Sequence, residues 1–178
     1  MSDLSVKIKR LHPDAVIPQY AHEFDSGFDL VATEDVIIEP GETALIPTGI
    51  AVELPSGCEL QVRPRSGITL RTKLRVQLGT IDSNYRGEIG VIVDNAIKRS
   101  WWRKIFTHLP LNINNERGGQ ETPHSYYYGS YIIRKGDRIA QGVIAPVAAA
   151  NFVEVDELSD TTRGESGFGS TGVVPSAT

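Results

Sequence analysis

The sequence predicts an all-β fold, a sandwich or a barrel, from three observations. Short runs of alternating and β-branched residues recur at close spacing, at residues 6–8, 36–38, 44–46, 59–62, 90–93, 131–133 and 142–144. Proline and glycine pairs such as Pro40-Gly41 separate these runs, as turns separate strands. The helical signal is limited to residues 67–72, with Ser66 as the expected N-cap.

Length and composition set broad limits on the function. A chain of 178 residues with 40% hydrophobic content can bury one core and is expected to form one main domain. The net charge of −4 argues against general nucleic-acid binding. The single cysteine, Cys58, excludes an internal disulfide, and no apolar run suggests a secretion signal or a membrane helix. A cytoplasmic protein without a membrane or nucleic-acid partner is therefore expected.

Residues 79–88, GTIDSNYRGE, place Asp82 and Tyr85 three positions apart between glycines. Apolar residues 74–78 and 89–93 flank this stretch, which predicts the tip of a β-hairpin. One interpretation is a plain turn in which Asp82 and Asn84 bond their own backbone. The other is a functional carboxylate and aromatic ring held at a hairpin tip.

Two earlier stretches carry groups suited to a metal and an anion. SGFDL at 26–30 sets Asp29 between apolar neighbours, where a carboxylate needs an ion-pair partner or a cation. RPRSGI at 63–68 offers guanidinium, hydroxyl and backbone N–H donors, the combination that phosphate prefers. A surface salt bridge of Asp29 and a simple helix cap at Ser66 are the structural alternatives.

With GDRIAQ at 136–141 and RGESGFGSTG at 163–172, these segments give five motifs in an order that resembles the trimeric dUTPase family. The resemblance implies a distorted jelly-roll barrel that assembles as a homotrimer. It also implies hydrolysis of dUTP to dUMP and pyrophosphate, assisted by Mg²⁺. That activity keeps uracil out of DNA and supplies dUMP for thymidylate synthesis.

The same resemblance implies roles for individual residues. Asp82 is expected to activate the attacking water, and Asp29 to hold Mg²⁺ through metal-bound water. Tyr85 is expected under the sugar, where its ring excludes a 2′-hydroxyl. The remaining expected substrate contacts are Arg65, Ser66, Gly67, Val76, Thr80, Ile81, Gly90, Gln141, Arg163, Phe168, Ser170 and Thr171. Asp137 and Arg138 are expected to be structural.

The chain also departs from the family pattern. Residues 94–134 are longer than the usual connection and resemble inserts of some phage-encoded dUTPases, with Trp101, Trp102 and basic residues among them. They are interpreted as a packed surface hairpin, or as a site that binds nucleic acid, an acidic protein or a neighbouring subunit. Gly142 stands where leucine is usual, and Ser166 replaces a frequent glycine. The expected organisation is a barrel domain at 1–161 and a glycine-rich, mobile arm at 162–178 that closes over the site.

Two other functions fit parts of the pattern. The related dCTP deaminases share the barrel, but they use a different hairpin motif, and the spacing of Asp82 and Tyr85 favours the phosphatase. A regulatory protein that kept the fold and binds a partner through residues 94–134 is the alternative from another functional class.

Overall fold

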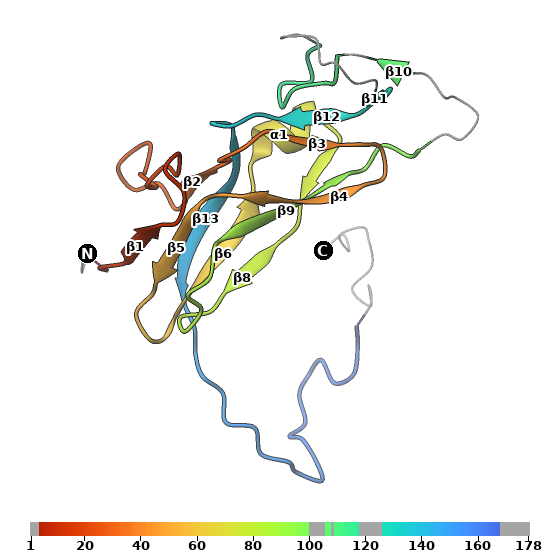
Figure 1. Cartoon of the computed structure of the whole chain (residues 1–178). Helices are drawn as coiled ribbons and strands as arrows, with labels where there is room; N and C mark the ends of the chain where they lie inside the picture. The colour runs from red at the N-terminus through yellow and green to blue at the C-terminus, as the bar shows by residue number, and fades with distance from the viewer. Residues whose placement is uncertain (1–3, 100–105, 108, 118–125, 168–178) are drawn as a thin grey trace. The chain divides into compact units, whose positions relative to one another are not determined.

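The structure, a computed structural model, describes residues 4–99, 106–107, 109–117 and 126–167 (Figure 1). Contacts divide the chain into two units, residues 1–148 and residues 149–178. Every described strand and helix belongs to the first unit, and the described residues of the second, 149–167, carry neither. The boundary expected at 161/162 stays a prediction.

The first unit is built almost entirely of short strands, which confirms the all-β prediction. The strands are β1 (Lys7–Arg10), β2 (Phe28–Val31), β3 (Val36–Ile38), β4 (Thr43–Pro47), β5 (Ile50–Glu53), β6 (Cys58–Pro64), β7 (Leu74–Val76), β8 (Gly79–Ile81), β9 (Gly90–Asn95), β10 (Phe106–Thr107), β11 (Tyr126–Tyr127), β12 (Tyr131–Ile133) and β13 (Arg138–Pro146). All the runs predicted from the sequence overlap strands. The described part of the chain contains no helix with the length and hydropathy needed to cross a membrane.

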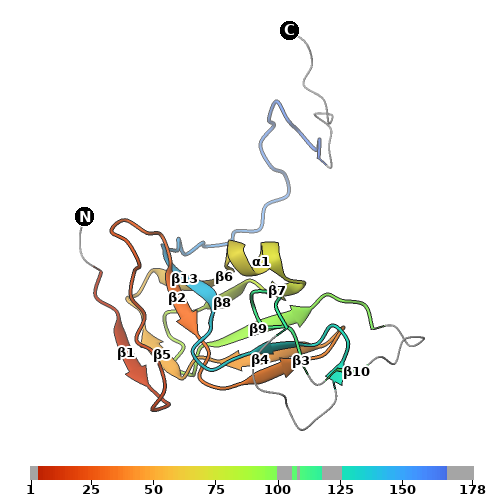
Figure 2. The ribbon, with the colours of Figure 1, turned by 90° about the horizontal axis from the view of Figure 1, so that it is seen from above.

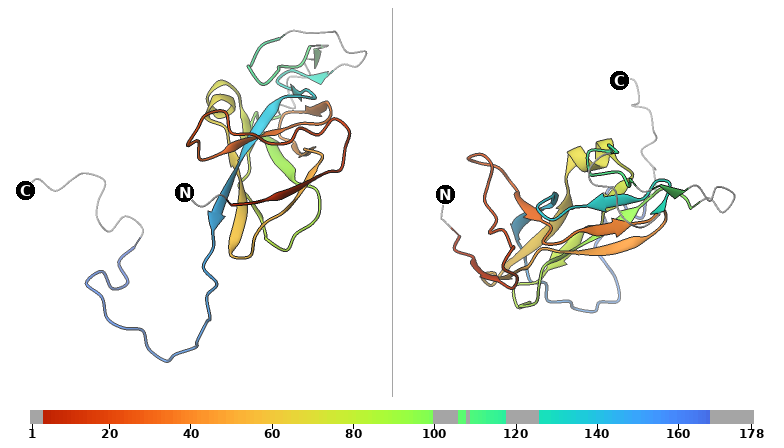
Figure 3. Two further views of the ribbon diagram at one scale, coloured as in Figure 1. Left: turned by 90° about the vertical axis from the view of Figure 1, so that its left-hand side faces the viewer. Right: turned by 45° about the horizontal axis from the view of Figure 1, so that its top comes forward.

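Two larger antiparallel sheets form the body of this unit. One has the order β2-β13-β6-β8 and the other the order β4-β9-β7, while β1-β5, β12-β3 and β10-β11 form pairs. The long strand β13 lies between β2 and β6 and is the extended blue strand of Figure 3. It brings segments far apart in the sequence into one sheet.

Alternation along the strands creates one core. In β9, Val91 and Val93 are buried while Ile92 between them is exposed, as expected when successive side chains point to opposite faces. Val62 of the first sheet packs in the same hydrophobic cluster as these two valines. The result is a distorted jelly-roll barrel.

The predicted hairpin forms between β7 and β9, but the strand at its tip, β8, belongs to the other sheet. β7 pairs with β9 in the register Val76↔Val93, whereas β8 pairs with β6 through Val62↔Gly79. A Cβ atom on Gly79 would lie 3.3 Å from Val62 Cβ, so the glycine permits this close approach. The turn that carries Asp82 is therefore supported by both sheets.

The single described helix, α1 (Ser66–Arg71), directly follows β6 and lies beside β7 (Figure 2). The prediction that Ser66 is its N-cap was wrong. The cap position is Arg65, in an extended conformation and without a side-chain cap bond, and Ser66 is the first helical residue. The serine hydroxyl therefore does not satisfy the helix N–H groups as a cap would.

The described part of the 94–134 region includes a small hairpin and an ordered loop. β10 pairs with β11, and the guanidinium of Arg99 lies 4.4 Å from the ring centre of Tyr127. Leu111 bridges both Arg117 and Tyr131, which joins the loop to β12. Trp101 and Trp102 lie outside the described residues.

Gly142, the departure from the usual leucine, lies beneath an aromatic ring. It pairs with Phe28 across β13 and β2, and a Cβ atom at this position would lie 2.4 Å from Phe28 Cε2. Tyr20 packs edge-on against Phe28, with ring centres 5.8 Å apart. Phe28 therefore occupies the space that a side chain at 142 would need, and Gly142 is buried.

This packing gives a testable prediction for stability. Gly142→Leu overpacks the contact and should lower the free energy of unfolding by about 1–3 kcal/mol. Combining it with Phe28→Ala should recover part of that loss, because the new leucine fills the volume that the ring vacates. Urea denaturation of the two single variants and the double variant measures the coupling, and strictly additive losses would contradict the proposed exchange of volume.

Candidate active site

Most of the expected site residues that the structure describes in the first unit fall into two separate pockets. The first, of about 790 Å³, lies between the loop before β2, the start of α1, the start of β13 and the loop at 113–114. The second, of about 510 Å³, lies between β4, β8, β9 and the turn after β8. No residue lines both pockets. We call them the basic pocket and the hairpin cleft.

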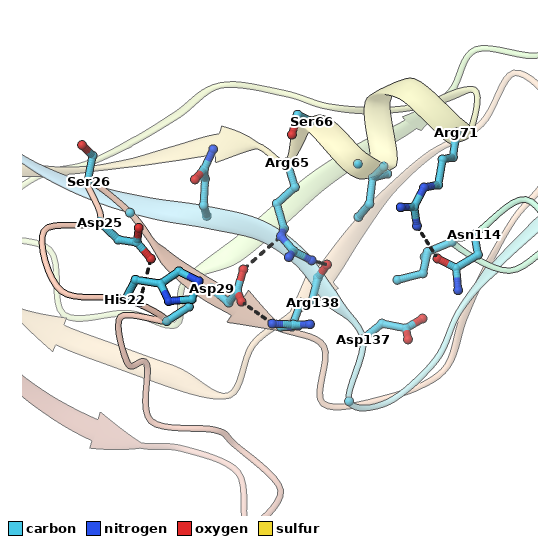
Figure 4. A pocket seen from close by; sticks show the side chains of 17 residues that line it. His22, Asp25, Ser26, Asp29, Arg65, Ser66, Arg71, Asn114, Asp137 and Arg138 are labelled. Carbon is cyan, nitrogen blue, oxygen red and sulfur yellow. Dashed lines mark hydrogen bonds and ion pairs between the residues drawn. The ribbon is translucent and has the colours of Figure 1, made fainter.

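Asp29 is the centre of the basic pocket. Its Oδ1 lies 2.9 Å from Arg65 Nε, and its Oδ2 lies 3.1 Å from Arg138 Nη1 (Figure 4). Arg65 Nη1 also donates to the Arg138 carbonyl at 2.8 Å. One partly buried carboxylate thus faces two guanidinium groups, which leaves this cluster net positive and suited to an anion.

Gln141 lies directly across from Asp29 in the β13–β2 pairing. Its Nε2 donates to the Pro64 carbonyl at 2.9 Å, and its Oε1 lies 2.9 Å from where a Cβ atom on Gly27 would be. Neighbours in β2 and β6 therefore fix the amide from both sides. Gly142 does not displace the Gln141 amide, because the Phe28 ring packs against position 142, and Gln141 pairs with Asp29 instead.

Ser66 and Gly67 complete the expected phosphate side. Both line the basic pocket at the first turn of α1, and a Cβ atom on Gly67 would meet nothing within 4 Å. Arg63 differs from Arg65, because its Nε donates to Gln61 Oε1 at 2.9 Å on β6. It does not line the basic pocket.

The expectation of a purely structural role fits Asp137 better than Arg138. Asp137 accepts the backbone N–H of Arg134 at 2.8 Å within the turn before β13, and burial raises the pKa of its carboxyl above the ordinary value. Arg138 instead contacts Asp29 in the pocket wall. Sequence reasoning missed it, although its position three residues before Gln141, a predicted phosphate contact, was the available signal.

The hairpin cleft is lined by apolar residues such as Leu45 and Ile92 together with polar ones, among them the acids Glu34, Asp82 and Glu88. Thr80, Ile81 and Gly90 line it as expected, and Leu45 packs over Gly90, where a Cβ atom would lie 2.6 Å from Leu45 Cδ1. Because β8 is the last strand of its sheet, alternate N–H and C=O groups on its outer edge are free to bind a ligand. Val76 packs against the core and is not among the lining residues.

Asp82 and Tyr85 stand in the turn at the edge of this cleft. The Tyr85 N–H donates to the Asp82 carbonyl at 3.0 Å, so the backbone closes the turn. Within the described part of the chain, the Asp82 carboxylate has no hydrogen bond or ion pair, which disfavours the plain turn-forming interpretation. Tyr85 Oη donates to the Glu88 carbonyl at 3.2 Å, and the ring lies against Gly87, where a Cβ atom would be 2.2 Å from Oη.

The expected arm is described only at its start. Arg163 Nε donates to the Ser166 carbonyl at 2.9 Å in a local turn, and Gly164 has a φ of 50°. Phe168, Ser170 and Thr171 lie outside the described residues.

The donor set of the basic pocket limits how Mg²⁺ can bind. The described residues hold no cluster of three or more histidine, cysteine, aspartate or glutamate side chains. Asp29 is a single carboxylate whose two oxygens already contact arginines. This fits a Mg²⁺ that keeps its waters and arrives with substrate phosphates, and does not fit a cage made by the protein alone.

Comparisons with known proteins agree with this geometry. The sequence model of the dUTPase family matches residues 14–100 and 129–172, leaving out part of the 94–134 region. Deoxyuridine 5'-triphosphate nucleotidohydrolase from Gloeothece citriformis is 44% identical over 172 residues, covering 96% of this chain and 98% of the relative. The protein of the same name from Crocosphaera subtropica is 45% identical, with 96% and 100% covered.

Solved structures give the same result. The dUTPase of Staphylococcus bacteriophage 80alpha with dUPNHPP has a TM-score of 0.89 and 38% identity, covering 95% of this chain and 99% of that one. A mutant dUTPase from phage phi11 of S. aureus, described with a structural Mg(II) ion, has a TM-score of 0.81 and 31% identity, with 88% and 99% covered. The chain belongs to the dUTPase family.

Proposed function

We propose that this protein is a dUTP diphosphatase that hydrolyses dUTP to dUMP and pyrophosphate by in-line attack of water on the α-phosphorus. The observation that carries the proposal is the pairing of a cleft bearing Asp82 and Tyr85 with a pocket in which the guanidinium groups of Arg65 and Arg138 face the single carboxylate of Asp29. One suits a base and sugar, and the other suits a triphosphate. Within a cell, the activity would keep uracil out of DNA and supply dUMP, in the cytoplasm.

Uracil binds in the hairpin cleft through main-chain groups near Thr80, Ile81 and Gly90, and the main chain of Val76, at the end of β7, is the fourth expected contact. The free edge of β8 offers N–H and C=O groups in a fixed order, so a base with a different donor pattern leaves some of them unpaired. Tyr85, tied to the Glu88 carbonyl, stands at the edge of the cleft and excludes ribose.

Asp82 orients the attacking water and takes its proton. Its carboxylate has no partner in the described part of the chain, so both oxygens are available to a water molecule. The triphosphate binds to Arg65, Ser66, Gly67 and Gln141. Arg65 contacts both Asp29 and the Arg138 carbonyl, so a bound phosphate competes for a guanidinium that is already oriented.

Asp29 would hold Mg²⁺ through the water shell of the ion, and the bound ion would neutralise charge on the phosphate oxygens. The arm residues Arg163, Phe168, Ser170 and Thr171 close over the bound nucleotide, with Phe168 stacking on the base and the others binding phosphate.

A homotrimer would unite the two pockets. The basic pocket and the hairpin cleft share no residue within one chain, so a complete site would form where the cleft of one copy meets the basic pocket of another. Exposed apolar residues beside the cleft, Leu45 and Ile92, would be covered in that assembly. A protein partner for the 94–134 region is a separate proposal, supported by the exposed Tyr128.

The first experiment compares pyrophosphate release from dUTP, dTTP, dCTP and UTP. Turnover is expected with dUTP alone, because the cleft reads the base by backbone groups and Tyr85 excludes a 2′-hydroxyl. Adding a chelator should remove the activity, and Mg²⁺ should restore it. Equal turnover of UTP would contradict the role of Tyr85, and deamination of dCTP would support the deaminase alternative.

Asp82→Asn should keep dUTP binding but lower kcat by about 10²–10⁴-fold, because the amide cannot accept the proton from water. Single-turnover kinetics and calorimetric binding of dUTP measure the two effects separately. Asn84→Ala, an exposed change in the same turn, is the matched control and should keep its activity. Wild-type turnover by the Asp82 variant would rule out this carboxylate as the base.

Shared sites predict complementation between inactive variants. Asp82→Asn alters only the cleft and Arg65→Gln only the basic pocket, so each homotrimer should be nearly inactive. Co-refolding them in equal amounts should restore about a quarter of wild-type activity, because about one site in four pairs two intact halves. Mixing the folded trimers without refolding is the control. No recovery after subunit exchange would mean that one chain supplies the whole site.

A further inference from the structure

The basic pocket extends beyond the residues of the five motifs. Its wall includes Arg71 at the end of α1 and Ile113 and Asn114 from the 94–134 region. None of these three residues was expected at the site from the sequence. A segment that lengthens the chain between the third and fourth motifs therefore contributes directly to the pocket that would hold phosphate.

Arg71 differs from the other two arginines of this pocket. Arg65 and Arg138 each contact the Asp29 carboxylate, at 2.9 and 3.1 Å. Arg71 Nη1 instead donates to the side-chain carbonyl Oδ1 of Asn114 at 3.2 Å, and it makes no ion pair with any residue that the structure describes. A neutral acceptor orients this guanidinium without neutralising it, and most of its donors are left for a ligand.

Asp137, an acid that also lines the pocket, does not act as the counter-ion of Arg71. Figure 4 draws Asp137 on the same side of the pocket as Arg71 and Asn114. The Asp137 carboxylate bonds the Arg134 backbone, and the charges that influence its pKa are those of Asp35 and Arg134. The positive charge of Arg71 is therefore directed at the pocket without a described carboxylate partner.

Asn114 is held in place by a loop that rests on the core. Asn112 Oδ1 accepts the backbone N–H groups of Asn114 at 2.9 Å and Glu116 at 3.0 Å. Asn115 Oδ1 accepts the hydroxyl of Tyr131, which is 1% exposed, at 3.1 Å. These bonds place Asn114 against α1, so the acceptor for Arg71 is preorganised.

The position of Arg71 suits an extended anion. Ser66 and Arg71 are the first and last residues of α1, so they are separated by about 8 Å along the helix axis. If one phosphate of a polyphosphate binds at Arg65 and Ser66, the adjoining phosphates extend either out of the pocket or along α1 toward Arg71. The second direction leads to the positive charge of Arg71, which lies outside the Arg65–Asp29–Arg138 cluster.

We propose that Arg71, oriented by Asn114, binds the distal phosphates of the substrate, so that the 94–134 region contributes to recognition of the pyrophosphate part. This inference rests on the proposed function for the identity of the substrate. Recognition of a pyrophosphate group by the pocket itself is independent of turnover. Arg71 is then a binding residue and Asn114 a positioning residue.

The test is calorimetric binding of inorganic pyrophosphate, with Mg²⁺, to the full chain. Arg71→Gln should weaken binding about tenfold, because a charge-assisted contact is lost. Asn114→Asp should weaken it to a similar degree, because the new carboxylate has almost the same shape but pairs with the Arg71 guanidinium. Lys73→Gln, which removes an exposed positive charge two positions after Arg71, is the matched control and should bind as wild type.

Kinetics then separate this proposal from the proposed function. With dUTP, Arg71→Gln and Asn114→Asp should raise KM about tenfold with little change in kcat, and inhibition by dUMP should be unaffected. Equal weakening by Lys73→Gln, or unchanged pyrophosphate affinity in the two pocket variants, would overturn the role of Arg71. A wild-type protein that binds pyrophosphate but does not turn over dUTP would overturn the proposed function and leave this site standing. Thermal unfolding of each variant checks that the fold is kept.

Discussion

The contact of the Asp29 carboxylate with Arg65 and Arg138 is the interaction on which the rest of the basic pocket depends. It joins β2, the end of β6 and the start of β13, and Asp29 and Arg138 lie 109 positions apart in the chain. Removing the carboxylate would leave two neighbouring guanidinium groups to repel each other. Removing either arginine would leave a partly buried charge with one partner fewer. The three side chains come together because β13 lies between β2 and β6. Two positive charges and one negative charge are thereby held in one place.

The same sheet also explains why one chain carries two separate pockets. β2 and β8 occupy opposite edges of the four-stranded sheet, with β13 and β6 between them. The basic pocket forms beside β2, and the hairpin cleft forms beside β8. The two intervening strands separate the Asp29 carboxylate from the backbone of β8 that is proposed to bind the nucleobase, since neighbouring strands lie about 4.8 Å apart. This separation within one chain is the physical basis of the proposal that a second copy completes the site.

Much of this architecture is readable from the sequence, and the failures have physical causes. The strands follow from alternation, and Asp82 and Tyr85 stand out because no ordinary turn needs both. Pairing of β8 with β6 was not predictable from local pattern, because it depends on the fit of Gly79 against Val62, a contact between distant segments. The error at Ser66 is of the opposite kind. A serine before an apolar run is a strong local cap signal, but the extended conformation of Arg65, which also bonds Asp29, moves the helix start one residue earlier.

Long-range packing also explains why Arg71 and Asn114 were not found from the sequence. Each looks like an ordinary surface residue, one in the last turn of a short helix and the other in a polar loop. Their meeting is fixed by Tyr131, whose hydroxyl bonds Asn115 on one side and accepts the Lys73 N–H on the other. Lys73 and Asn115 lie within two positions of Arg71 and Asn114, so one buried tyrosine sets the distance between the helix and the loop. A segment between the third and fourth motifs becomes part of the pocket because β12, which carries that tyrosine, is part of the core.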